Sequence, residues 1–248
     1  MDYFWYTYVF IIGSIIGSFL NVCIYRIPDK ESIVIGRSHC TSCGHELTFK
    51  EMIPIFSYLF LGGKCRCCKA RVSFQYPAVE LLTAILYLLS VIRFGYSFYT
   101  LLLCIFISVL IVIAGIDAHT KLIPDLLNLW ILVLGILHIL SDTSFLLEGI
   151  LGFVIVSVPM LVISIFTGGF GGGDIKLSAV CGLFLGWKLI LCGFLFGCIT
   201  AALWGMFLIL KKKASKKTAI SFGPFLSAGF ILSVLFGNQL LTFYFGLF

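Results

Sequence analysis

Long apolar runs separated by short polar segments dominate this chain. Helices of about 17 to 25 apolar residues can cross a hydrocarbon layer of roughly 30 Å. The pattern predicts eight such helices, at residues 4–24, 77–95, 98–116, 126–141, 147–167, 175–187, 189–210 and 222–246. The sixth is short, and Gly186, Trp187 and Lys188 form only a thin turn before the seventh.

The composition supports this interpretation. Hydrophobic residues make up 60% of the chain, charged residues 11%, and there are 25 Phe in 248 residues. A soluble core could not bury so much apolar surface. We therefore expect an all-α polytopic membrane protein, a bundle of about eight transmembrane helices.

The basic residues predict an orientation. With the amino terminus outside, 15 of the 17 Lys and Arg residues fall in the inner segments, and only Arg93 and Lys188 lie outside. Such a bias is typical of cytoplasmic loops. Merging the sixth and seventh spans would place the basic run at 211–217 outside. The net charge of +6 therefore reflects topology and attraction to lipids, and no pattern of aromatic and basic residues indicates nucleic acid.

The chain divides into three predicted parts: a first transmembrane helix at 1–25, a cytosolic Cys-rich domain at 26–76, and a seven-helix membrane domain at 77–248. In the Cys-rich part, two CxxC pairs are formed by Cys40 with Cys43 and by Cys65 with Cys68. Four thiolates at this spacing are typical of a structural zinc site, which a domain of about 50 residues needs to fold.

Alternatives to this zinc site are open. Two disulfides are less suited to a reducing cytosol. Cys67 could compete with Cys68, and His39 or His45 could replace a sulfur, although solvated surface histidines are common. Gly44, Gly62 and Gly63 are expected to form tight turns beside the pairs. The remaining cysteines lie in spans and are expected to pack as small apolar residues: Cys23, Cys104, Cys181, Cys192 and Cys198.

Two aspartates are candidates for catalysis. Asp117 ends the third span, where the helix dipole opposes a negative charge, and Asp174 follows a glycine-rich segment. Placing a carboxylate at the centre of a membrane helix costs about 2.5 to 3.5 kcal/mol. The presence of each aspartate beside an apolar span therefore needs a structural or functional explanation. Asp125, after Pro124, can instead cap a helix. Asp174 could also be a helix N-cap, and Lys176 could either act on it or anchor the span.

If Asp117 and Asp174 face each other, they can share a proton, so that one acts as base and one as acid on a water that attacks a peptide carbonyl. The glycines at 168, 169 and 171–173 allow positive φ angles and close approach of another backbone. We expect an extended peptide to dock there, with Gly171, Gly172 and Gly173 as substrate-binding candidates.

In these motifs the chain resembles the type IV prepilin peptidases. The resemblance is carried by GSFLNV at 17–22 with RIP at 26–28, both CxxC pairs, YPAVE at 76–80, GID with IPD at 115–125, GGGDIK at 171–176 and FGPFL at 222–226. It implies a membrane aspartic protease with Asp117 and Asp174 as the catalytic pair, the latter in the GxGD signature shared with presenilin-like proteases. It also implies Cys40, Cys43, Cys65 and Cys68 as zinc ligands.

The resemblance further implies the substrate and a second activity. The expected substrate is a prepilin or competence pseudopilin, cut after Gly and before Phe at the inner face of the bacterial plasma membrane. Many members then methylate the new amino terminus with S-adenosylmethionine. For this donor Asn21, Arg26 and Glu80 are weak candidates, each of which also has an ordinary role at a span end.

Two other classes of function remain open from the residues alone. A proton-coupled transporter could use paired aspartates, although no inverted internal repeat is evident. A non-enzymatic membrane scaffold could dock partners through the zinc domain, but this leaves Asp117 and the glycines without a role.

Overall fold

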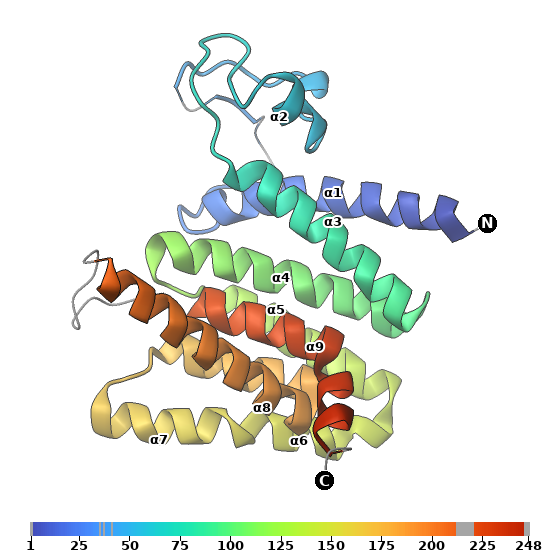
Figure 1. Cartoon of the computed structure of the whole chain (residues 1–248), viewed down its shortest axis with the longest axis vertical. Helices are drawn as coiled ribbons and strands as arrows, with labels where there is room; N and C mark the ends of the chain where they lie inside the picture. The colour runs from blue at the N-terminus through green and yellow to red at the C-terminus, as the bar shows by residue number, and fades with distance from the viewer. Residues whose placement is uncertain (1, 35, 37, 41, 212–220, 246–248) are drawn as a thin grey trace. The chain divides into compact units, whose positions relative to one another are not determined.

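The computed structural model describes residues 2–34, 36, 38–40, 42–211 and 221–245, shown in Figure 1. The basic residues at 212–217, on which part of the predicted topology rests, lie outside this range. In the described part the regular structure is helical, with isolated β-bridges between His39 and Glu46 and between Lys64 and Arg71. The expected all-α architecture is confirmed.

The chain forms two compact units, Met1–Val112 and Ile113–Phe248. The first contains α1 (Asp2–Arg26), α3 (Gln75–Phe94) and the larger part of α4 (Phe98–Thr120). Glycines bring α1 and α3 together: a Cβ on Gly13 would lie 2.7 Å from the Cα of Ala84, and one on Gly17 would lie 2.7 Å from the Cα of Glu80. Close backbone approach through small residues is typical of helices packed in membranes.

Between α1 and α3 the chain forms the Cys-rich segment. Its only helices in the described part are η1 (Phe49–Glu51) and α2 (Phe56–Phe60). Figure 1 shows the rest of this segment as turns and loops. With so little regular structure, the segment depends on its side-chain cluster for stability.

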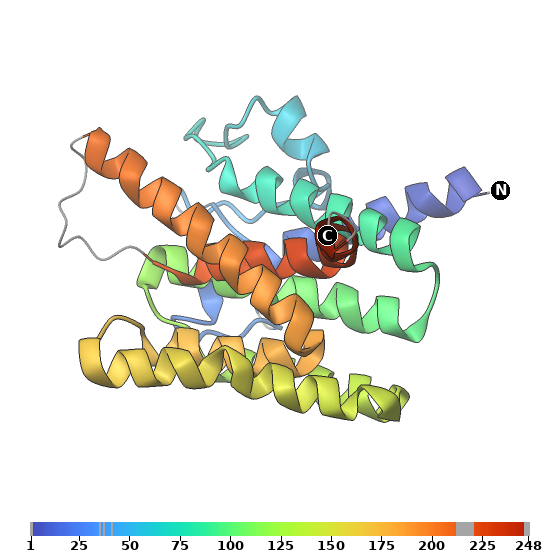
Figure 2. The same ribbon diagram turned by 60° about the horizontal axis from the view of Figure 1, so that its bottom comes forward.

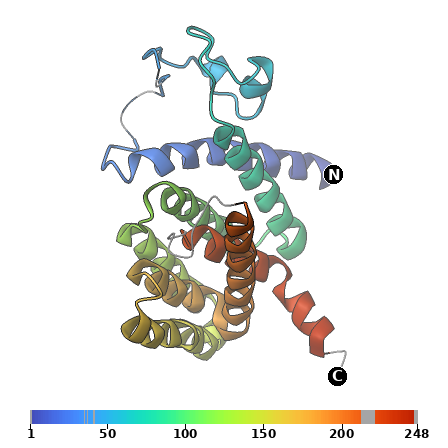
Figure 3. The ribbon, with the colours of Figure 1, turned by 60° about the vertical axis from the view of Figure 1, so that its left-hand side comes forward.

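The second unit is built around α8 (Gly172–Leu210), which contacts α5 (Asp125–Ser141), α6 (Leu146–Ile155) and α9 (Gly223–Phe245). The turn η2 (Thr143–Phe145) leads into α6, and α7 (Ser157–Thr167) follows it. Figure 2 shows α6, in yellow-green, and α7, in yellow, as successive parts of one rod. Figure 3 shows the second half of α8 beside α9.

Helix α8 contains the turn that the sequence predicts. Gly186 has φ 78° and ψ 168°, which breaks the helical conformation and divides α8 into two halves. A Cβ at Gly186 would lie 3.0 Å from the ring of Phe145. Both the positive φ and the close contact favour glycine at this position.

Five helical segments among the described residues are long and apolar enough to cross a membrane: Phe4–Arg26, Gln75–Phe94, Phe98–Thr120, Thr143–Thr167 and Gly172–Leu210. The apolar helix Asp125–Ser141 is shorter. These helices make the chain a membrane protein.

Candidate active site

Asp117 lies in the last turn of α4, and its side chain is 5% exposed. The backbone N–H of Gly223, the first residue of α9, donates a hydrogen bond of 2.9 Å to its Oδ2. A Cβ on residue 223 would lie 2.8 Å from this oxygen, so glycine is required there. One donor thus stabilises a buried carboxylate at a helix end that otherwise disfavours it.

Asp174 is the third residue of α8, where the helix dipole favours a negative charge. The N-cap position belongs to Gly171, so the alternative that Asp174 is the N-cap is wrong. The backbone of Gly171 hydrogen-bonds the Asp174 carboxyl group. A Cβ on Gly171 would lie 3.2 Å from Asp174 Oδ2, which is tighter than an ordinary contact.

The structure brings Asp117 and Asp174 together. They come from opposite helix ends, the end of α4 and the start of α8, and their charges interact. Asp117 is buried and Asp174 is partly buried. Two partly desolvated carboxyl groups whose charges interact titrate as a coupled pair, in which one can serve as acid and the other as base.

Asp125 and Lys176 form a separate pair. Lys176 Nζ lies 2.8 Å from Asp125 Oδ1, with both side chains more than half exposed. Asp125 is the first residue of α5 and Pro124 is its N-cap, without a side-chain capping bond, so the predicted capping by Asp125 is wrong. Its charge does complement the helix dipole in the first turn of α5. Lys176 pairs with Asp125, because the starts of α5 and α8 adjoin.

The glycine-rich segment uses the positive φ angles that its glycines allow at one position only. Gly168 alone among its glycines has a positive φ, 63°, and it ends α7 as a left-handed C-cap. Gly172 and Gly173 lie in the first turn of α8. A Cβ on Gly173 would lie 3.1 Å from Ile123, whereas one on Gly172 would meet nothing within 4 Å. Close packing explains Gly171 and Gly173, and Gly172 leaves the backbone beside Asp174 uncovered.

Four cysteines in the first unit are arranged as a potential metal site. The sulfurs of Cys40, Cys43, Cys65 and Cys68 all lie within 4.8 Å of one another, and Cys40 Sγ is 3.8 Å from Cys68 Sγ. In a tetrahedron with metal–sulfur bonds of about 2.3 Å, sulfurs are separated by about 3.8 Å. The donor set therefore fits zinc.

The two CxxC turns have the same backbone pattern. The N–H of Gly44 donates to the carbonyl of Cys40 at 2.9 Å, and the N–H of Lys69 donates to that of Cys65 at 3.0 Å. Both Gly44 and Lys69 have positive φ, 70° and 60°. Gly62 and Gly63 also have positive φ, so the predicted turns are confirmed.

Backbone hydrogen bonds from Ser42 and Cys43 lower the pKa of the Cys40 thiol to about 6. This favours the thiolate, the form that binds metals. The metal-competent group contains Cys68 and not Cys67, and neither His39 nor His45 belongs to it among the described residues.

The three weak candidates for methyl-donor binding lie at different places in the first unit. Asn21 is 1% exposed and donates to the carbonyl of Tyr76 at 3.1 Å, joining α1 to α3. Glu80 is buried and accepts a 2.7 Å bond from the N–H of Ile55, a residue with the unfavourable φ of 63°. Glu80 thereby ties the Cys-rich segment to α3.

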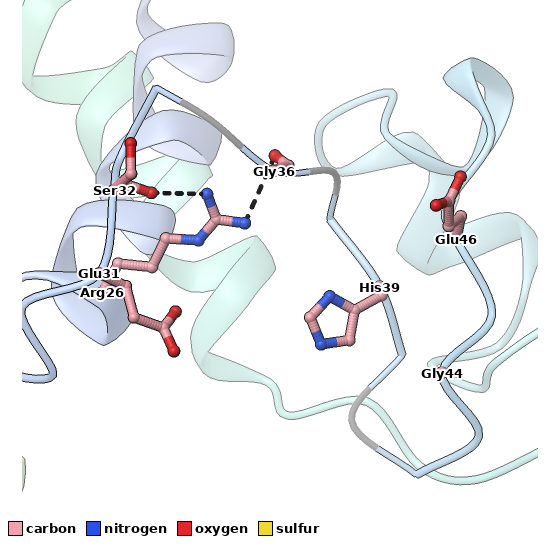
Figure 4. A pocket seen from close by; sticks show the side chains of 7 residues that line it. All are labelled: Arg26, Glu31, Ser32, Gly36, His39, Gly44 and Glu46. Carbon is pink, nitrogen blue, oxygen red and sulfur yellow. Dashed lines mark hydrogen bonds between the residues drawn. The ribbon is translucent and has the colours of Figure 1, made fainter.

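Arg26 lines an open pocket of about 580 Å³ (Figure 4). Its guanidinium donates to the carbonyl of Ser32 at 3.0 Å and to that of Gly36 at 3.5 Å. Figure 4 shows His39 across the space from Arg26. The pocket is lined by Arg26, Glu31, Ser32, Gly36, His39, Gly44 and Glu46.

Gly223 is the site residue that sequence reasoning missed. The segment FGPFL at 222–226 was noted only as part of a resemblance. Its signal was a glycine followed by proline at a helix start, where a backbone N–H has no helical partner and can bind a carboxylate.

Two family models match successive parts of the chain. A sequence model of the bacterial peptidase A24 N-terminal domain matches residues 11–94, and one of the type IV leader peptidase family matches residues 104–206. No solved structure matches the chain significantly.

Curated relatives match over nearly the full length. The chain is 41% identical to a prepilin leader peptidase/N-methyltransferase of Bacillus subtilis, over 95% of this chain and 96% of that protein. It is 31% identical to the protein of the same name from Pseudomonas aeruginosa, over 94% and 91% of the two chains. The matched range 11–94 contains the four cysteines, the matched range 104–206 contains Asp117 and Asp174, and the chain belongs to the type IV leader peptidase family.

Proposed function

We propose that this protein removes the basic leader from prepilins or pseudopilins, cutting after Gly and before Phe, with Asp117 and Asp174 as its catalytic pair. The proposal rests on the interaction between the charges of these two carboxyl groups, with Asp117 held by the N–H of Gly223. The relatives' names support this activity and lend no support to a transporter or a scaffold.

The reaction follows from the pair. One carboxylate accepts a proton from water, whose oxygen bonds to the scissile carbonyl carbon. The other carboxyl group protonates the departing amine as the C–N bond breaks. Hydrogen bonds from the backbones at Gly223 and Gly171 hold the two side chains in place while their protonation states exchange.

The substrate backbone is assigned to Gly171, Gly172 and Gly173. No Cβ covers the first turn of α8 at these positions, and Gly172 has open space where a side chain would stand. The N–H groups of a helix's first turn lack helical partners and can bind a carbonyl of a peptide drawn up to Asp174.

Methylation of the new amino terminus is the proposed second activity, as in the relatives' names. S-adenosylmethionine, when bound, supplies an electrophilic methyl group. We assign it to the pocket at Arg26, whose guanidinium suits the donor's carboxylate, while Glu31 and Glu46 suit its hydroxyl and ammonium groups. Asn21 and Glu80 do not line this pocket. They support it by holding α1, α3 and the Cys-rich segment together.

The four-cysteine cluster is proposed to bind one structural zinc ion. Four thiolates close the coordination shell and leave no position for a reacting water, so the metal serves folding. The proposed domain limits are 1–25 for the first span, 26–76 for the zinc domain and 77–248 for the membrane peptidase.

We also propose eight spans, with the amino terminus outside and the catalytic pair at the cytosolic face of the bacterial plasma membrane. The spans are α1, α3, α4, α5, α6 with α7, the two halves of α8, and α9. The break at Gly186 supports counting α8 twice, and Lys188, beside it, bonds Glu148 at 3.9 Å near the start of α6.

A cleavage assay tests the activity. Purified protein in detergent is mixed with a prepilin bearing a Gly-Phe junction and labelled S-adenosylmethionine. We expect loss of the leader and label on the new amino-terminal Phe. An intact substrate would contradict the peptidase proposal, whereas cleavage without label would contradict methyl transfer alone.

A further inference from the structure

Three buried polar side chains in the second unit have atoms without hydrogen-bond partners among the described residues. They are the amide N and O of Asn128 and the hydroxyls of Ser178 and Ser227. The side chains are 5%, 0% and 1% exposed. Burying an amide or hydroxyl without a hydrogen-bond partner is unfavourable, so three such groups on different helices require an explanation.

Serines in helices usually avoid this cost by bonding a carbonyl of their own helix. In the same unit, Ser157 donates to Phe153, and Ser233 donates to the carbonyl of Phe230 at 2.9 Å. Ser178 and Ser227 make no such bond. Their hydroxyls are therefore turned away from the backbone that would satisfy them.

These three residues stand at one level of the bundle. The bond between Lys176 and Asp125 aligns the starts of α8 and α5, and the bond between Gly223 and Asp117 aligns the start of α9 with the end of α4. The catalytic pair lies at this level.

From that level each residue is one helical turn further in. Asn128 follows Asp125 by three residues, and Ser178 follows Asp174 by four, as Ser227 follows Gly223. Positions three or four apart share a helix face, with an axial rise of about 4.5 to 6 Å. Asn128, Ser178 and Ser227 thus lie at about the same depth, one turn below the level of the catalytic pair, and are called the polar layer.

The burial of this layer limits what it can bind. A peptide cannot reach side chains that are at least 95% buried, but a water molecule can occupy the interior. A buried water makes about three hydrogen bonds, to groups that otherwise lack partners. Asn offers donors and an acceptor, and Ser offers both in one group.

We propose that the polar layer binds ordered water and supplies it to Asp117 and Asp174. The inference rests on the proposed peptidase function. Each cleavage consumes one water: its oxygen joins the carbonyl carbon, one proton passes to a carboxylate of the pair, and the amine leaves with a proton from the other. In an apolar bundle that water needs a store, and the layer provides one.

X-ray radiolytic labelling tests for the water directly, because hydroxyl radicals formed from bound water oxidise the side chains beside it. The sites measured are Leu127, Leu177 and Leu226, which are buried neighbours of the layer. The buried Ile190 is the reference. We expect the three leucines to be labelled severalfold faster than Ile190 in the full-length protein.

Variants of the three residues test whether the bound water takes part in the reaction. Asn128→Leu, Ser178→Ala and Ser227→Ala should each slow labelling of the adjacent leucine and lower kcat about tenfold, the rate equivalent of one hydrogen bond, with KM unchanged. Ser233→Ala, which removes a partnered buried hydroxyl from the same helix as Ser227, should leave kcat and labelling unchanged.

The outcomes separate the inference from the function it rests on. Leucine labelling no faster than that of Ile190, or layer variants with wild-type kcat, would overturn the water site. Wild-type protein that fails to cleave a prepilin would overturn the peptidase proposal, and the labelling would still decide whether the layer holds water. Thermal melts establish that each variant is folded.

Discussion

Gly223 illustrates how one residue without a side chain positions a carboxylate, that of the proposed catalytic residue Asp117. Its N–H holds Asp117 Oδ2, and the space where a Cβ would stand is filled by the same carboxyl group. A larger residue would have to displace the carboxylate from its donor.

We predict that Gly223→Ala lowers kcat about a hundredfold or more, because small misplacements of a reacting group cost about that much. Cleavage kinetics with a prepilin substrate measure the effect. Gly237→Ala is the matched control in the same helix, since its Cβ would lie 2.7 Å from the far end of the flexible Leu189 side chain and 3.7 Å from the Cβ of Ser233. Wild-type kcat in Gly223→Ala would show that this hydrogen bond does not position Asp117.

Glu51 makes a pH-dependent contribution to the folding stability of the Cys-rich segment. The N–H of Thr48 donates to its Oε2 at 2.8 Å and the Thr48 hydroxyl at 2.7 Å. These bonds lower the pKa of the Glu51 carboxyl below its ordinary value. Because the pKa is lowered on folding, the stabilisation is present above the unfolded-state pKa and is lost as the pH falls through the folded-state value.

Glu51→Gln should therefore lower the melting temperature of the Cys-rich segment at pH 7, and the gap from wild type should close as the pH falls below about 4. Melts followed by hydrogen exchange at several pH values measure this gap. Asp29→Asn, at an exposed position of the same unit, is the control. A gap of constant size down to pH 3 would refute the linkage to Glu51.

Individual residues were predictable where their type conflicted with the surroundings. Asp117 and Asp174 were conspicuous as acids beside apolar spans. The partners of Lys176 and Asp125 were not, because a pairing across 51 residues depends on how α5 and α8 adjoin. Gly223 was hidden because a backbone donor carries no side-chain signature.

At the scale of elements, the Cys-rich segment has two turns of the same design. Gly44 occupies the left-handed position in one turn and Lys69 occupies it in the other. The CxxC spacing was sufficient to predict the cluster, because each turn is local. The choice of Cys68 over Cys67 required the packing of both turns.

Removal of metal should unfold this segment while α1 and α3 stay helical, since the four-thiolate site does not exist in the unfolded chain and metal binding and folding are then one process. Hydrogen exchange after chelation should show loss of protection at 38–72 but not within 77–94. Cys65→Ser should bind less than one zinc per chain, while Cys67→Ser binds one. Full protection at 38–72 after complete metal removal would contradict a structural role.

Gly186 has the corresponding role in the membrane part. A Gly-Trp-Lys turn between two apolar runs predicted a break, and the left-handed φ of Gly186 provides it within α8. The two separate helices expected there are joined in one element, because the break occupies a single residue. The predicted helix 147–167 is divided at Val156 into α6 and α7. The bounds of the other helices follow the apolar runs closely, because burial in lipid and burial in the bundle require the same hydrophobicity.

For the whole molecule, the break in α8 decides the topology. If both halves cross the membrane, Lys211 lies on the cytosolic side; if α8 crosses once, Lys211 lies outside. The sequence favoured the first arrangement through its basic residues.

Reporter fusions show on which side of the membrane each of these segments lies. A fluorescent protein that folds only in the cytosol should be active after Lys211 and inactive after Lys188, and alkaline phosphatase fusions should show the reverse. Fusions after Lys121 and Asp142 provide internal references for the inside and the outside. An inactive fluorescent fusion after Lys211 would contradict eight spans.

The central claim is that Asp117 and Asp174 act as one catalytic pair, and the most direct test is prepilin cleavage by Asp117→Asn, Asp174→Asn and the double variant. We predict that each single variant loses about 10²- to 10⁴-fold in kcat and that the double variant is hardly slower, because the two groups act as a unit. Asp125→Asn, which breaks only the exposed pair with Lys176, should cleave normally. Retained cleavage in either Asp117→Asn or Asp174→Asn would contradict the account.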